Sequence, residues 1–196
     1  GPGPTSTLSR RRFLAGTAVS AAALAVPNES PAAAAEPDAG ARKIKLGVVG
    51  CGGRGAWIAN LFREHGGYEM HAVADYFPEV AQAAGQALGV DQTRRFSGLS
   101  GYRKLIDSGV EAVALETPPC FFPEHVQAAV DARLHVYMAK PIAVDVPGCL
   151  QVEAAAKKAT AGQRCFLVDY QMPTDPHNLE CARRFRDGAI ERLGVV

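Results

Sequence analysis

The segment KLGVVGCGGRG, residues 45–55, decides the fold of this 196-residue chain. Its first six residues form a compact apolar run bounded by glycines, which predicts a buried strand. The following residues, Arg54–His65, have a helical periodicity, with an inward face expected at Ile58, Leu61, Phe62 and His65. A strand, a glycine-rich turn and a helix in this order are typical of a turn that binds the diphosphate of a dinucleotide.

Each glycine of the turn has a separate predicted role. Gly50 permits the tight turn, Gly52 lets a diphosphate approach the backbone, and Gly55 lets the helix lie close to the strand. The start of the helix, at Gly53 and Arg54, would offer unpaired N–H groups and a partial positive charge to the phosphates. A mononucleotide P-loop is disfavoured, because no Gly-Lys-Ser/Thr follows these glycines.

An acidic residue follows at the position that reads the ribose. Asp75 ends the next expected strand, Met70–Asp75, about 20 residues after Gly55. A carboxylate there accepts hydrogen bonds from the ribose hydroxyls and repels a 2′-phosphate, and Tyr76 supplies no countercharge. We therefore expect NAD as the cofactor, in preference to NADP.

Short apolar runs alternate with helical patterns along the rest of the chain. Further strands are expected at residues 95–97, 110–117, 134–138 and 165–170, and further helices at 78–88, 102–107, 123–132, 145–161 and from 175, with Asp145 and Asp175 as N-caps. Strands that each precede a helix predict an α/β fold with a doubly wound parallel sheet of the Rossmann type, about six strands with helices on both faces.

Residues 1–41 have the layout of an export signal. Arg10, Arg11 and Arg12 precede an apolar stretch that is too short to span a bilayer, and Ala32–Ala35 offers a cleavage site. The segment Ser9–Leu14 resembles the twin-arginine signal. We expect residues 1–41 to be a signal peptide and linker, recognised by the twin-arginine export machinery, and the protein to be periplasmic or otherwise exported.

Composition and spacing exclude several other classes. Apolar residues make up 47% and charged residues 21%, as in globular proteins, and the net charge of +1 gives no case for nucleic acid. The five cysteines form no CxxC pair and the five histidines no HxH or HExxH, so no metal site is predicted. His125 opens the helix behind Thr117 and could face the cleft there, but we expect it on the helix surface or at a helix cap.

A second polar group is expected at the carboxyl edge of the sheet. Thr117-Pro118 follows one expected strand and Lys140-Pro141 follows the next. A lysine beside a desolvated pocket can bind a substrate hydroxyl and share in proton transfer. The alternative is an ordinary loop lysine at the rim of the sheet.

These motifs together resemble the Gfo/Idh/MocA oxidoreductases. The resemblance extends from Lys43 to Val196 and implies that Lys140 lies beside the nicotinamide and the substrate. Two departures are visible: Ala139 replaces the usual Glu, and in Asp169–Met172 the residue Gln171 keeps a polar group while the usual Arg is missing. The resemblance implies that residues 42–170 are the NAD-binding domain and that 171–196 are the stub of a truncated substrate domain.

Three functions fit these observations. The first is an exported NAD-dependent oxidoreductase, a homo-oligomer when full length, that passes a hydride between the cofactor and a sugar, cyclitol or other polyol. Lys140 would be catalytic, and Thr117, Pro118, Lys140 and Gln171 would contact the cofactor; the 196 residues alone are expected to be inactive. The alternatives are an NAD-dependent glycoside hydrolase with a closed redox cycle, and a non-catalytic nucleotide-binding protein.

Overall fold

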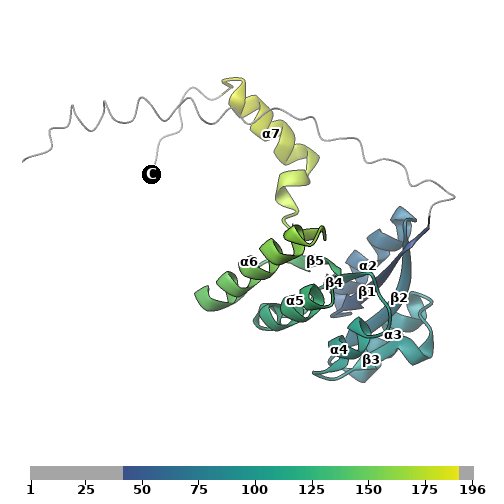
Figure 1. Ribbon diagram of the computed structural model, residues 1–196. Coiled ribbons are helices and arrows are strands. Elements are labelled where there is room, and N and C mark those ends of the chain that lie inside the picture. Colours follow the sequence, from purple (N-terminus) through teal and green to yellow (C-terminus); the bar gives the residue numbers. More distant parts are fainter. Residues whose placement is uncertain (1–41, 190–196) are drawn as a thin grey trace, which may run out of the picture. The chain divides into compact units, whose positions relative to one another are not determined.

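The computed structural model describes residues 42–189, and Figure 1 shows their helices and strands. The strands are β1 (Ile44–Val49), β2 (Tyr68–Asp75), β3 (Arg95–Ser97), β4 (Ala112–Leu115), β5 (His135–Ala139) and β6 (Phe166–Asp169). The helices are α2 (Gly53–His65), α3 (Pro78–Ala87), α4 (Gly101–Ile106), α5 (Phe122–Asp131), α6 (Val146–Ala161) and α7 (Pro176–Arg186). The predicted export signal and residues 190–196 lie outside the described residues.

The six strands form one parallel sheet in the order β3-β2-β1-β4-β5-β6. This confirms the predicted Rossmann-type sheet. The chain order reverses between β1 and β4, so the carboxyl ends of these two strands border the crevice where such sheets bind ligands.

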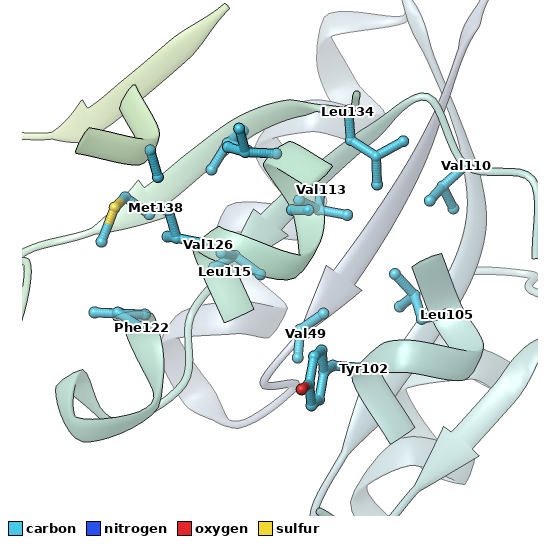
Figure 2. Close-up of a cluster of buried hydrophobic side chains, with 14 of the residues drawn as sticks. Val49, Tyr102, Leu105, Val110, Val113, Leu115, Phe122, Val126, Leu134 and Met138 are labelled. Atoms are coloured by element: carbon cyan, nitrogen blue, oxygen red, sulfur yellow. The ribbon is translucent and has the colours of Figure 1, made fainter. Parts of the chain in front are cut away.

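Successive side chains along the strands point to opposite faces of the sheet, and an apolar cluster forms on each face. Val113 and Leu115 belong to the cluster that includes residues of α4, α5 and α6, which Figure 2 shows. Ala112 and Ala114 belong to the cluster that includes residues of α2 and α3. Helices therefore cover both faces, as the sequence predicts.

Two local expectations were wrong. The strand expected at residues 110–117 is only four residues long, Ala112–Leu115, and these four residues are in register with β1 and β5. The expected inward face of α2 was also misplaced: Leu61 is 44% exposed and His65 is exposed, while Gly55, Ile58 and Ala59 are buried. The helix approaches the sheet most closely at Gly55, and the buried residues Ile58 and Ala59 lie on the same side of the helix.

Within residues 42–189, no helix combines the length and the apolar character needed to cross a membrane. Two helices begin at an aspartate whose side chain caps their first turn. Asp145 accepts a hydrogen bond from Gly148 N at 2.7 Å, and Asp175 accepts bonds from the first turn of α7. Both aspartates are the N-caps that the sequence predicts.

Phe122→Ala tests the larger core. The Phe122 ring is 1% exposed and belongs to the cluster on the α5 face. Its removal should lower the free energy of unfolding by about 3–5 kcal/mol, because the surrounding side chains cannot fill the cavity. Urea unfolding measures this loss. Leu150→Ala is the control, since Leu150 is 59% exposed, and it should cost less than about 0.5 kcal/mol; equal losses would contradict the core assignment.

Candidate functional site

The turn between β1 and α2 is built by very close backbone contacts. Gly50 has a φ of +88°, and a Cβ there would lie 2.7 Å from the carbonyl carbon of Glu116. A Cβ at Gly55 would lie 1.8 Å from the carbonyl oxygen of Gly50. Only glycine fits at these two positions, so the packing roles expected for them are the ones that the structure shows.

The outer side of the same turn is open. A Cβ at Gly52 or Gly53 would meet no described atom within 4 Å. Gly52 is the N-cap of α2 and gives it no side-chain cap, and the first turn holds no acidic residue. The first N–H groups of α2 therefore face free space with a partial positive charge, which suits a phosphate group. On this observation, the turn fits the diphosphate of a dinucleotide.

Asp75 lies beside the turn and fixes its first residues. One carboxylate oxygen accepts a hydrogen bond from Cys51 N at 2.7 Å, and the other accepts one from Phe77 N at 3.0 Å. Each oxygen keeps a further lone pair that a ribose hydroxyl can use. Burial, followed by the charge of Asp75, raises the pKa of Cys51 to about 12, so this thiol stays protonated and fills the turn.

A cavity of about 560 Å³ opens next to the turn. Most of its walls are apolar and aromatic, and it is lined by five of the predicted site residues: Gly50, Gly52, Asp75, Thr117 and Pro118. Other walls come from the ends of β2, β3 and β4 and from α4 and α5. Its size and the few polar groups in it are typical of a small-molecule site.

His125 lies in the wall of this cavity, so the expectation of a surface or capping histidine was wrong. The residue is 6% exposed, and its ring lies 4.2 Å from the Tyr102 ring and 5.7 Å from the Phe121 ring. Its Nδ1 is 3.2 Å from the Thr117 hydroxyl. Burial lowers the pKa of His125 to about 4, so the imidazole is neutral near pH 7 and shares a hydrogen bond with Thr117.

Arg54 points toward the sheet and joins a buried charge cluster that sequence reasoning missed. We define the Arg54 cluster as Arg54, Glu116, Tyr137 and Asp169. Arg54 Nη2 donates to Asp169, and Arg54 Nε lies 3.0 Å from Glu116 Oε2 without hydrogen-bond alignment. In the sequence, Glu116 and Asp169 are visible as acidic residues near the ends of two expected strands. Their positions do not indicate that both pair with Arg54.

Lys140 and Gln171 occupy the carboxyl edge of the sheet but do not line the cavity. Lys140 directly follows β5, is exposed, and precedes Pro141 through a cis peptide bond. Gln171 stands two residues after β6, which pairs with β5 at Ala139 and Asp169. The predicted site thus divides into a cavity beside the glycine turn and an open edge around β5 and β6. In the described part of the chain, no cluster of three or more His, Cys, Asp or Glu residues could hold a metal ion.

Gly55→Ala tests the backbone contact of the turn. The new Cβ would overlap the Gly50 carbonyl oxygen, so α2 must move and the free energy of unfolding should fall by several kcal/mol, roughly 3 or more. Gly53→Ala is the matched control, because open space surrounds it; it should change stability by less than about 1 kcal/mol. Chemical denaturation of both variants measures the difference, and similar stabilities would refute the contact.

The neutral state of His125 predicts a pH dependence of stability. In the unfolded chain, His125 takes up a proton as the pH falls below its ordinary pKa of about 6.5. In the folded chain, His125 stays neutral until the pH approaches about 4. Stability should therefore fall by up to about 3 kcal/mol as the pH drops from 6.5 to 4. His125→Phe should flatten this part of the profile, and an unchanged slope would show that other groups cause it.

The chain is similar to a family of known oxidoreductases. The model of an oxidoreductase family with an NAD-binding Rossmann fold matches residues 44–167. The inositol 2-dehydrogenase of Klebsiella pneumoniae is 30% identical over 148 residues, which make up 75% of this chain and 42% of that protein. The chain thus spans about two fifths of the length of such relatives.

Solved structures have the same fold. A myo-inositol 2-dehydrogenase from Lactobacillus plantarum gives a TM-score of 0.68 at 19% identity, over 78% of this chain and 43% of that one. The WlbA dehydrogenase from Bordetella pertussis, in complex with NADH and UDP-GlcNAcA, gives 0.64 at 26% identity, over 75% and 44% of the two chains. Because the family model matches residues 44–167, more than half of the sequence, this chain belongs to the Gfo/Idh/MocA family of oxidoreductases with an NAD-binding Rossmann fold.

Proposed function

We propose that the full-length protein is an exported NAD-dependent oxidoreductase acting on a cyclitol or a related polyol. The observation that carries this proposal is the open glycine turn with Asp75 at its side. Family membership and relatives named inositol 2-dehydrogenase support the reaction and the substrate class.

The residues present fit the cofactor in two places. Backbone N–H groups at Gly52 and Gly53 would bind the diphosphate, and Asp75 would accept hydrogen bonds from the ribose hydroxyls. Thr117, held by His125, would present its hydroxyl to the cofactor from the segment that follows β4. When bound, NAD supplies the hydride acceptor.

Lys140 would act on the substrate. Lys140 directly follows β5, at the edge where ligands of parallel sheets bind. There it would orient the substrate hydroxyl and take part in moving the hydroxyl proton as the carbon gives up its hydride. Gln171, after β6, would contact the cofactor from the neighbouring strand.

The organisation of the whole protein forms part of the proposal. Residues 42–170 would be the NAD-binding domain, and residues 171–196 would begin a substrate domain that completes the site and takes part in a homo-oligomer. The paired arginines followed by Phe13-Leu14 support export by the twin-arginine machinery to the periplasm or beyond. That pathway carries folded proteins, so the cofactor would travel in its bound form.

Lys140→Ala tests the reaction in the full-length protein. Incubation of the wild type with NAD and myo-inositol or another cyclitol should produce the absorbance of reduced nicotinamide. The variant should lose about 10²–10⁴-fold in kcat while the Kd for NAD stays within about threefold, because the groups proposed to bind the diphosphate and the ribose, the glycine turn and Asp75, are unchanged.

Lys158→Ala is the control, since Lys158 is an exposed lysine that pairs with Asp131. It should keep full activity. Release of an aglycone from a glycoside without net NADH would instead favour the closed redox cycle. Binding of NAD without turnover on a broad panel of polyols and glycosides would contradict an enzymatic role.

A further inference from the structure

The Arg54 cluster occupies one edge of the sheet beside the glycine turn. Glu116 directly follows β4 and Asp169 ends β6, while Tyr137 lies on β5 between those strands. Arg54, in the first turn of α2, reaches both carboxylates from the α2 side. At the end of β5, Ala139 contributes only a methyl group between the two strands that carry the acids.

The cluster holds more negative than positive charge. One guanidinium faces two carboxylates, which leaves a net charge of −1 when both acids are ionised. The Glu116 side chain is 0% exposed and that of Asp169 is 10% exposed. Among the described residues, no donor makes an aligned hydrogen bond to either oxygen of Glu116. The surplus charge is thus weakly screened, and its field extends further than that of a surface charge.

The position of the cluster relates it to one half of a dinucleotide. The cavity, with Asp75, lies over the ends of β1, β2, β3 and β4 and suits the adenosine half. A dinucleotide crosses the reversal of strand order between β1 and β4, so its other half lies over β4, β5 and β6. That is the edge that holds Glu116 and Asp169. The Arg54 side chain, 35% exposed, contacts both acids. Glu116 also lies against Gly50 and lines the cavity, so the cluster adjoins the glycine turn.

We propose that the Arg54 cluster makes the site discriminate between the redox forms of its cofactor, binding NAD⁺ more tightly than it would without the surplus negative charge. The oxidised nicotinamide ring is a cation and the reduced ring is neutral, whereas the rest of the molecule is the same. A buried negative cluster therefore favours the oxidised form selectively. This inference rests on the proposed function.

Glu116 should also make the binding of NAD⁺ depend on pH. Burial raises the pKa of Glu116 to about 7. The positive charge of Arg54 opposes this rise, and the negative charge of Asp169 adds to it. The charged or titratable groups facing it are Arg54 from α2, Tyr137 from β5 and Asp169 from β6. A cation nearby favours the ionised carboxylate. Binding of NAD⁺ should therefore release a proton near pH 7, and the affinity for NAD⁺ should rise with pH.

The test compares two nucleotides on the full-length protein. Calorimetric titrations with NAD⁺ and with NADH, at about pH 6 and about pH 8.5, give each Kd and the proton release. At the higher pH, Asp169→Asn and Glu116→Gln should each weaken NAD⁺ on the order of tenfold and leave NADH within about twofold. Glu116→Gln should also abolish the pH dependence of NAD⁺ binding.

Asp131→Asn is the matched control, because it removes an exposed, ion-paired carboxylate from the end of α5. It should change neither Kd. Equal losses of NAD⁺ and NADH in the cluster variants would show a merely structural role and overturn the proposal, as would unchanged affinities. Glu116→Gln keeps the shape of the side chain and provides the test if Asp169→Asn unfolds. A wild-type protein that binds neither nucleotide would overturn the proposed function itself, and the inference with it.

Discussion

The contact between Gly55 and the Gly50 carbonyl oxygen is the constraint on which the rest of the site depends. It brings α2 so close to the end of β1 that no side chain fits between them. The helix N-terminus then faces open space beside Gly52, and the backbone of Cys51 comes within hydrogen-bond distance of Asp75. The open side of the turn and the carboxylate beside it are both consequences of one short contact.

The same contact fixes where Arg54 lies. Because Arg54 precedes Gly55 in the first turn of α2, its side chain reaches the ends of β4 and β6. Two carboxylates can be buried at this edge only with such a cation, since an isolated buried charge costs several kcal/mol. The compensation is incomplete, which leaves Glu116 with a raised pKa and the edge with surplus negative charge.

Much of the fold could be predicted because its signals are local. The glycine turn and the caps at Asp145 and Asp175 depend on residues only a few positions apart, and Asp75 ends the second strand at a fixed spacing of about 20 residues from the turn. Alternation of apolar runs with helical patterns was enough to predict a parallel sheet. The predictions were wrong where segments distant in the sequence determine the structure. The length of β4 is an example, because it depends on the pairing with β1 and β5.

The sequence by itself determined the class of fold, the glycine turn proposed for a diphosphate and the carboxylate proposed for a ribose, because each is encoded by residue types at fixed spacing. Only the tertiary structure placed His125 in the cavity wall against Thr117, and brought Arg54 to Glu116 and Asp169 across three elements. The physical reason is that burial and charge pairing join residues far apart in the chain, and no local pattern records which distant side chain neutralises a buried acid.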